Sequence, residues 1–395
     1  MTGIEERLRD ALAARADAVQ DDGRPRELPA ARVGSSAIRL WAPAAVVAAI
    51  LVLVVLVTVA GTRTVTAPAP AVRPTPAAPR GLAPPVATVW PQAVHQIPKK
   101  APGGRTFIPD AFAGDRLVVG RGLTRNRPDG IWAYDLRTRG FAQITPLKDL
   151  HIAHAPVAAG DGYVAWSAHR GHRVEVWAVP LAGGVPRRLA STTAARSSQN
   201  TFEGIDLVIA EGMAVWSPSD GGVYRVPLRG GKAIRMLGTL GYHLAIWPWV
   251  GSPQADQARD VLVRRPMEQL KNALTGELRE ARPPAGRTSW RACAVTWCHN
   301  GREAWRRDGT GLRTLPGDAH SPLHADHVVL MHQRDRDGRG ASAVHDVATG
   351  RTGLLFRTPT RAGDPAPPTL YTHDGLFQYQ SGDHTQTVID LRAIS

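Results

Sequence analysis

The segment AVPLAGG at residues 178–184 returns as RVPLRGG at residues 225–231. Upstream of each copy, AWS at residues 165–167 returns as VWS at residues 215–217. In both units a short apolar run precedes a polar turn, a second alternating run and a Gly-containing turn. This order is typical of antiparallel β-hairpins. The two copies therefore predict a chain built from repeated β units.

The same order of runs continues through residues 90–395, and we divide this region into seven units. First runs are expected at residues 116–120, 163–167, 213–217, 243–247, 296–299, 328–332 and 376–379. Seven units of roughly 44 residues match the period of four-stranded propeller blades, and six units of about 51 residues also fit the spacing. Because such a unit cannot bury both faces alone, units must stack on one another.

The sequence therefore predicts an all-β fold, a β-propeller with seven blades favoured over six, and a pair of β-sandwiches is the alternative. The last unit ends after its second strand, at Ser395. We expect the missing outer strand to come from residues 88–97, because ring closure removes an exposed sheet edge.

Charge and cysteine content exclude several classes of protein. The 395 residues carry a formal charge of +14, with 48 Lys and Arg against 34 Asp and Glu. Arginine supplies most of the cations, which together with abundant Ala, Gly and Pro is typical of a GC-rich genome, so the charge is weak evidence for a nucleic-acid partner. We expect no such partner, because the basic region is predicted below to lie outside the cell. Two cysteines exclude a Cys₄ zinc site and a cysteine-ligated iron–sulfur cluster.

An uncharged segment at residues 40–61, LWAPAAVVAAILVLVVLVTVAG, predicts one transmembrane helix. At ~1.5 Å per residue it is long enough for a ~30 Å hydrocarbon core. A cleaved signal peptide is the alternative, but the 39 preceding residues favour an uncleaved signal-anchor. Arginines close to the segment set its expected orientation, and four lie just before it (Arg24, Arg26, Arg32 and Arg39) against three just after it (Arg63, Arg73 and Arg80). We therefore expect the N-terminus in the cytoplasm.

The segments on either side of the span differ in composition. Residues 1–39 are expected to form a cytoplasmic tail with a short amphipathic helix. Residues 62–89 contain repeated prolines and predict an extended extracytoplasmic linker. We therefore expect a single-pass protein of the cell membrane whose propeller, residues 90–395, lies outside the cell.

Cys293 and Cys298 are five positions apart, too far for a disulfide along a straight strand. A bridge requires residues 294–297 to turn back, and Asn300-Gly301 favours a hairpin directly afterwards. We predict a structural disulfide that closes this loop, with a redox dithiol as the alternative.

Histidines precede several of the first runs, and we expect them to gather on one face of the ring as candidate ligand-contacting residues. They are His151, His154, His243, His320, His324, His327 and His373. The spacing of His320, His324 and His327 suggests a site for a divalent metal, since imidazoles are good ligands for such ions. Solvated loop residues are the alternative interpretation, and no other cofactor is predicted.

The chain also resembles membrane-anchored TolB-like β-propeller proteins of actinobacteria. The resemblance depends on VWPQAV at residues 89–94, the VPLxGG turns, HLAIWPWVG at residues 243–251 and the cysteine-containing loop. It implies an extracytoplasmic propeller and carries over no catalytic residue.

We favour a binding or scaffold module for a protein, a peptide or an envelope glycan, with no catalytic residue assigned. A metal-dependent hydrolase or lyase that uses the histidine-rich face is one alternative. A signal transducer that couples the propeller to the cytoplasmic tail is the other. The sequence does not predict an oligomeric state.

Overall fold

A computed structural model describes residues 81–147, 157–170, 173–193, 205–218, 220–253, 265–335, 337–358, 371–373 and 375–395. The predicted tail and span and most of the predicted linker lie outside these residues. Within the described ranges, no helix is both long and apolar enough to cross a membrane.

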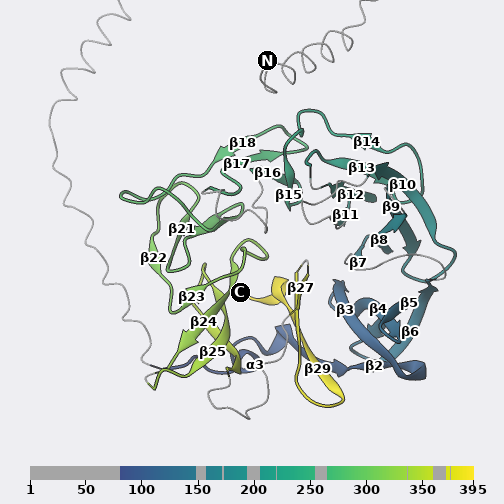
Figure 1. The fold of residues 1–395 in the computed structure, drawn as a ribbon, viewed down its shortest axis with the longest axis horizontal. Coiled ribbons are helices and arrows are strands. Elements are labelled where there is room, and N and C mark those ends of the chain that lie inside the picture. The colour runs from purple at the N-terminus through teal and green to yellow at the C-terminus, as the bar shows by residue number, and fades with distance from the viewer. Residues whose placement is uncertain are drawn as a thin grey trace, which may run out of the picture. The chain divides into compact units, whose positions relative to one another are not determined.

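Seven antiparallel sheets follow one another along the chain and are arranged as blades around a ring (Figure 1). The fold is a seven-bladed β-propeller, and the prediction of seven blades is confirmed.

Blades 1 to 3 are formed by the first part of the chain. Blade 1 contains β2 (Lys100–Ala101), β3 (Arg105–Ala113), β4 (Leu117–Thr124), β5 (Arg127–Asp135) and β6 (Gly140–Pro146). Blade 2 contains β7 (Val157–Gly160), β8 (Tyr163–Arg170), β9 (Arg173–Pro180) and β10 (Arg187–Thr193). Blade 3 contains β11 (Asp206–Ala210), β12 (Met213–Ser217), β13 (Tyr224–Pro227) and β14 (Ile234–Arg235).

Blades 4 to 7 complete the ring. Blade 4 contains β15 (His243–Ile246), β16 (Trp249–Ser252), β17 (Gln269–Asn272) and β18 (Leu278–Glu280). Blade 5 contains β19 (Ala292–Cys293), β20 (Trp297–His299), β21 (Glu303–Arg306) and β22 (Arg313–Thr314). Blade 6 contains β23 (Asp318–Ala319), β24 (Val328–Arg334), β25 (Gly340–Asp346) and β26 (Thr352–Arg357). Blade 7 contains β27 (Tyr371–His373), β28 (Leu376–Gln380), β29 (Thr385–Asp390) and β1 (Val94–Pro98).

The predicted order of strands within each blade needs a correction. Five of the seven predicted first runs are the second strand of their blade, and the run at residues 116–120 is the third strand of the five-stranded blade 1. Only the run at residues 243–247 begins an innermost strand, β15. The second strand is paired on both edges and covered on both faces by neighbouring blades, so it is the most apolar run of each unit. Two innermost strands, β19 and β23, have only two residues each.

Apolar clusters between successive blades form the core. Trp166 on β8 belongs to the cluster between blades 1 and 2, and Trp216 on β12 belongs to the cluster between blades 2 and 3. Both side chains are almost completely buried, at 0% and 1% exposure. Because large aromatic side chains bury much apolar area, these contacts hold neighbouring blades together.

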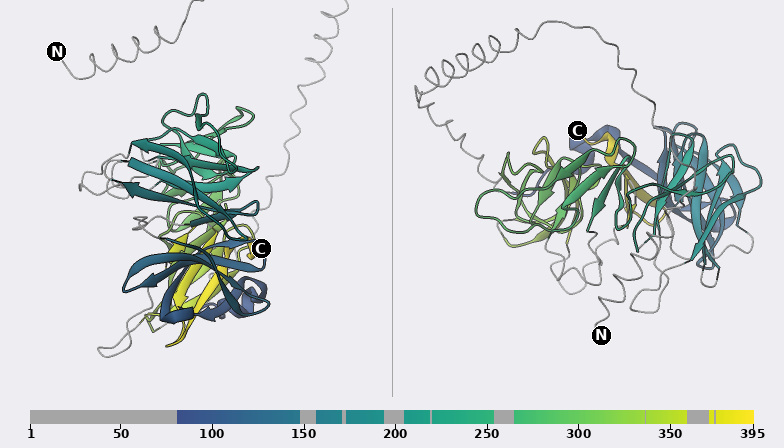
Figure 2. Two further views of the ribbon diagram at one scale, coloured as in Figure 1. Left: turned by 90° about the vertical axis from the view of Figure 1, so that its right-hand side faces the viewer. Right: turned by 90° about the horizontal axis from the view of Figure 1, so that it is seen from above.

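The ring is closed as predicted, because the outer strand of blade 7 comes from the N-terminal side of the propeller. β1 pairs with β29 in antiparallel register, from Val94 opposite Ile389 to Pro98 opposite Thr385. The C-terminus therefore lies beside the first described elements, among them the helix α3 (Val86–Val89) (Figure 2).

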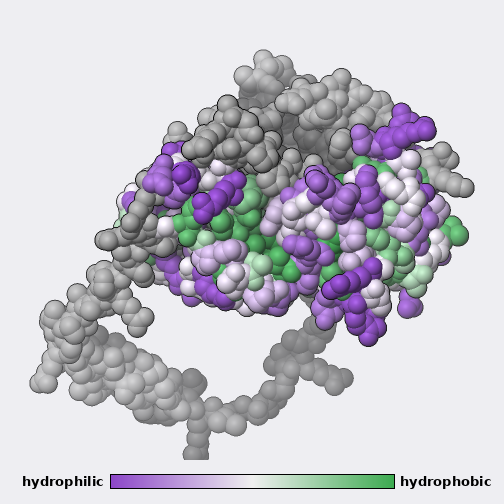
Figure 3. Space-filling model, turned by 90° about the horizontal axis from the view of Figure 1, so that it is seen from below, coloured by the Kyte–Doolittle hydropathy of each residue, from purple (hydrophilic) through white to green (hydrophobic). Residues whose placement is uncertain are grey.

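Short helical turns and apolar contacts support the closure. The 3₁₀ turns η1 (Pro91–Ala93), η2 (Pro102–Gly104) and η3 (Leu391–Ala393) lie near the closure or at the entry to blade 1. Val86 and Trp90 are buried against blades 6 and 7, so the propeller includes the last residues of the predicted linker. On the side of the propeller where the ring closes, hydrophobic residues gather between hydrophilic ones (Figure 3).

Candidate functional site

The cysteine pair is a disulfide between the first two strands of blade 5. Cys293 on β19 lies directly opposite Cys298 on β20, and their Cα atoms are 4.0 Å apart. The backbone N–H of Ala294 donates to the carbonyl oxygen of Trp297 at 2.7 Å, which forms the turn that the bridge requires. The predicted disulfide-closed loop is confirmed.

The predicted histidines do not form one group in the described part of the chain. Each innermost strand is entered from the outermost strand of the preceding blade, so its two ends lie on opposite faces of the ring. His243 begins β15, whereas His320, His324 and His327 follow β23. His151 and His154 lie outside the described residues, as does the side chain of His373 at the end of β27.

The three predicted metal ligands have separate partners. The ring of His320 stacks on that of His332, with centroids 4.2 Å apart, and the ring of His324 meets Phe377 edge-on at 4.9 Å. The Nε2 atom of His327 is 3.0 Å from the carbonyl oxygen of Ile394. Among the described residues, no group of three or more His, Cys, Asp or Glu side chains could hold a metal ion. The structure therefore provides no ligand set at these three positions.

Burial keeps several of the histidines neutral. Burial lowers the pKa of His324 to about 4 and also lowers the pKa of His243. Burial, followed by the nearby charge of His332, lowers the pKa of His320. These shifts are typical of imidazoles in structural positions and do not by themselves indicate a reactive group.

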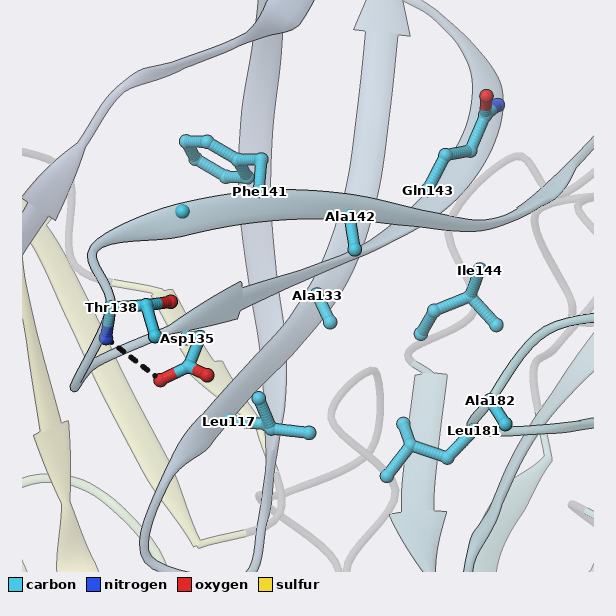
Figure 4. A pocket seen from close by; sticks show the side chains of 11 residues that line it. Leu117, Ala133, Asp135, Thr138, Phe141, Ala142, Gln143, Ile144, Leu181 and Ala182 are labelled. Atoms are coloured by element: carbon cyan, nitrogen blue, oxygen red, sulfur yellow. Dashed lines mark hydrogen bonds between the residues drawn. The ribbon is translucent and has the colours of Figure 1, made fainter.

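A hollow at the outer edge of the seam between blades 1 and 2, which we call the notch, is the candidate binding site. Its volume is about 290 Å³. It is lined by Leu117, Ala133, Asp135, Thr138, Gly140, Phe141, Ala142, Gln143, Ile144, Leu181 and Ala182. Leu117, Ala133 and Ile144 from blade 1 face Leu181 and Ala182 from blade 2, so the walls are mostly apolar (Figure 4).

The notch exists because small side chains stand where blade 2 has large ones. Ala133 pairs with Ala142 in blade 1, and the equivalent pair in blade 2 is Ala178 with Arg187. Likewise, Leu117 lies opposite Asp135, and the equivalent pair is Tyr163 with Pro180. Leu117 in the notch thus corresponds to Tyr163 in blade 2, and Ala142 corresponds to Arg187.

The opposite wall of the notch is the first copy of the repeated turn. Leu181 and Leu228 occupy equivalent positions, because the N–H of each donates to a glycine carbonyl oxygen, that of Gly162 at 2.8 Å and that of Gly212 at 3.0 Å. The glycine pairs at residues 183–184 and 230–231 all have positive φ, which glycine adopts without strain. Ala182 in the notch thus corresponds to Arg229 in the next seam.

The next seam, between blades 2 and 3, is closed by these larger residues. Leu228 is only 3% exposed and belongs to the apolar cluster of that seam, whereas Leu181 is half-buried. The guanidinium of Arg187 donates to the carbonyl oxygen of Arg229 across the gap.

The rim of the notch carries exposed cations. The Nε atom of Arg116 donates to Asp135 at 2.7 Å, and the same carboxylate accepts from the backbone N–H groups of Arg137 at 2.8 Å and Thr138 at 3.1 Å. The hydrogen bond from Arg116 holds the pKa of Asp135 well below its usual range. Arg137 and Arg139 are exposed, and neither has an ion-pair partner among the described residues.

The notch is not predicted by the sequence alone. One signal was available in the repeated turn, where Ala182 replaces Arg229 and Val185 replaces Lys232. The other decisive difference, Ala142 against Arg187, lies in outer strands that share no obvious sequence pattern.

No protein-family model matches this chain. No curated protein matches it in sequence either. Solved β-propellers resemble it in fold. TolB from Acinetobacter baumannii matches with a TM-score of 0.32 and 12% identity over 65% of this chain and 55% of TolB, so the chain spans about half the length of TolB.

Two further solved structures give similar values. The propeller domain of the Trilobed protease from Pyrococcus furiosus has a TM-score of 0.41 and 9% identity, over 72% of this chain and 93% of that domain. BamB from Moraxella catarrhalis has a TM-score of 0.35 and 12% identity, over 70% of this chain and 80% of BamB. These likenesses concern the fold alone.

Proposed function

We propose that this protein is a binding module that captures an apolar side chain of a partner polypeptide in the notch between blades 1 and 2. The observation that carries the proposal is the open, apolar notch at a seam whose neighbour is closed. Its volume of about 290 Å³ is near the lower end of the range for small ligand pockets. A leucine or phenylalanine side chain suits this apolar lining.

The lining favours a polypeptide over an envelope glycan. Sugars are recognised through hydroxyl groups, which need several polar side chains that converge on the ligand. The carboxylate of Asp135 already accepts from Arg116 and from two backbone N–H groups. The wall from blade 2 consists of Leu181 and Ala182. An apolar anchor residue is therefore the better match.

Arg137 and Arg139 favour acidic residues beside that anchor. Opposite charges across an interface increase the association rate and select among partners. The propeller region has the same positive sign as the chain as a whole, whose formal charge is +14.

The membrane topology is part of the same proposal. Residues 40–61 would anchor the chain, with the N-terminus in the cytoplasm and the propeller outside the cell. The apolar composition of that segment supports a membrane span. The disulfide between Cys293 and Cys298 supports an external propeller, because disulfides form in oxidising environments such as the cell exterior. Protease treatment of intact cells should degrade the propeller and leave a tag at the N-terminus protected, and the reverse pattern would contradict the topology.

A random peptide library tests the binding proposal. The full chain should select peptides with one large apolar residue flanked by Asp or Glu. Ala142→Arg, which introduces the side chain found in blade 2, should weaken binding of a selected peptide at least tenfold. Leu312→Arg is the control, because it adds the same charge at an exposed turn of blade 5. Equal binding to the wild type and to Ala142→Arg would reject the notch as the site.

A further inference from the structure

The notch lies beside a free sheet edge. β6 is the outermost strand of blade 1 and is seven residues long. It pairs with β5 on one side, and within the described ranges no strand pairs with its other side. An unpaired edge offers backbone N–H and C=O groups to any extended chain that approaches it.

The propeller already binds an extended segment at the corresponding edge of blade 6. Pro85 forms a parallel bridge with Leu354 on β26, and the N–H of Leu354 donates to the carbonyl oxygen of Pro84 at 2.7 Å. The next residue, Val86, is 3% exposed, and its Cα would lie 2.8 Å from a Cβ placed on Gly353. In this fold, therefore, the outer edge of a blade can hold a short extended segment with an apolar side chain packed beside it.

The register of β5 shows which groups of β6 face outward. Leu136 donates to the carbonyl oxygen of Arg116, so alternate residues of β5 bond to β4. The residues between them, including Ala133, bond to β6 through its partner Ala142. The backbone groups of Phe141 and Gln143 therefore point toward the free edge.

The free edge and the notch are thus offset by one residue. The side chain of Ala142 points into the notch, while Phe141 and Gln143 on either side of it present backbone hydrogen-bonding groups to the free edge (Figure 4). Their side chains lie on the other face of β6 (Figure 4). Arg137 and Arg139 lie in the turn that precedes β6. β6 and the turn before it therefore offer outward backbone hydrogen-bonding groups, an apolar pocket and positive charge within about seven residues of the chain.

We propose that an extended peptide of the partner adds to the free edge of β6, with one apolar side chain in the notch and an acidic residue near Arg137 and Arg139. This inference rests on the proposed function and specifies how the partner is bound. Main-chain pairing gives affinity in this mode, and the pocket and the charges give specificity.

The chain's own Pro-rich segment is a poorer occupant of this edge. Residues 62–80 contain arginines and no acidic residue, so they would be repelled by the cations of the turn. Their prolines also lack the N–H groups that strand pairing requires.

An N-methyl scan of a library-selected peptide, measured on the full chain, tests the inference. N-methylation removes one backbone donor, so it should weaken binding about tenfold at alternate peptide positions and have little effect at the positions between them. A similar effect at every position, or none at any, would overturn strand addition. If Ala142→Arg still abolished binding in that case, the notch proposal would stand alone.

A second pair of variants tests the protein side. Gln143→Pro removes an outward N–H group and should weaken the peptide about tenfold more than Gln143→Ala, which loses the same side chain but keeps the backbone donor. Unfolding curves show whether Gln143→Pro is folded, and if it is not, the N-methyl scan decides alone. A photo-crosslink from position 143 to residues 62–80 or to a second copy, in place of the peptide, would assign the edge to that occupant and overturn the inference.

Discussion

The seam between blades 1 and 2 and the seam between blades 2 and 3 have nearly the same backbone but different surfaces. The two PLxGG turns make equivalent hydrogen bonds, and their glycines have similar φ values. The second seam has Leu228 buried and Arg187 bonded across it, whereas the first has Ala142 and a half-buried Leu181. The comparison shows that the fold positions each seam and that a few outer side chains decide whether it is open.

Truncating the two equivalent leucines should give the largest difference between the seams. Leu228→Ala removes a fully packed side chain and should lower the free energy of unfolding by about 2–4 kcal/mol. Leu181→Ala should lower it by less than about 1 kcal/mol, since the notch leaves this residue half-buried. Urea denaturation measures both, and equal losses would show that the two seams are packed alike.

The seam between blades 5 and 6 extends the comparison to pH. His299 is completely buried, and its Nε2 atom is 2.9 Å from the carbonyl oxygen of Ser321 at the start of the next blade's first loop. Burial lowers its pKa to about 4. The folded pKa lies below the unfolded value of about 6.5. The contribution of neutral His299 to the free energy of unfolding is therefore complete above pH ~6.5 and is lost as pH falls toward 4, by at most about 3 kcal/mol.

Replacing His299 should flatten that pH dependence. The free energy of unfolding of His299→Gln should change less between pH 6.5 and 4 than that of the wild type, whatever its absolute stability. His384→Gln, at an exposed histidine, is the matched control. An unchanged slope in His299→Gln would assign the acid sensitivity to other groups.

Exchanging the outer-strand residues should have smaller and unequal effects on the stability of the two seams. Arg187→Ala removes the hydrogen bond to Arg229 and should lower the free energy of unfolding by about 0.5–1 kcal/mol. Ala142→Arg should change it by no more than about 0.5 kcal/mol, because the added side chain has an equivalent place in blade 2. A large loss in Ala142→Arg would show that the notch cannot accept the residue of its neighbour.

The smallest effect at neutral pH is expected for Asp135, which blade 2 replaces with Pro180. The hydrogen bond from Arg116 lowers the pKa of this carboxyl, so its contribution to stability is complete above pH ~4 and is lost as pH falls further. Asp135→Asn should therefore reduce the dependence of stability on pH below about 4. The loss at pH 7 should be small, because Arg116 is about half exposed and solvent screens the ion pair. Equal acid unfolding curves for the two proteins would contradict this.

Most of the fold could be predicted from the repeats, because Gly-rich turns and alternating runs reflect local backbone requirements. The closing strand could also be predicted, since an incomplete last unit requires a partner. The predicted order of strands within a blade is wrong, because the most apolar runs, such as residues 328–332, are second strands covered on both faces. Short innermost strands such as Asp318–Ala319 carry no comparable pattern.

The candidate site is harder to predict because it depends on side chains that are smaller than their counterparts in the next blade. Ala142 and Ala182 are ordinary residues in their own turns and strands, and only superposition of neighbouring blades shows what they lack. A histidine-rich sequence predicts a ligand site because imidazoles are chemically versatile. Their actual partners, including Phe377 and the carbonyl oxygen of Ile394, depend on contacts between distant parts of the chain.

The way the N-terminal side of the chain enters the ring determines how the propeller would respond to mechanical tension. Residues 84–86 contact β26 of blade 6, and β1 then pairs along the edge of β29 in blade 7. A pull applied ahead of residue 84 would act first on the contacts with blade 6 and only then on the five paired residues of β1. Two neighbouring blades would share the force before any other blade was stretched, so tension would open the ring at its closure.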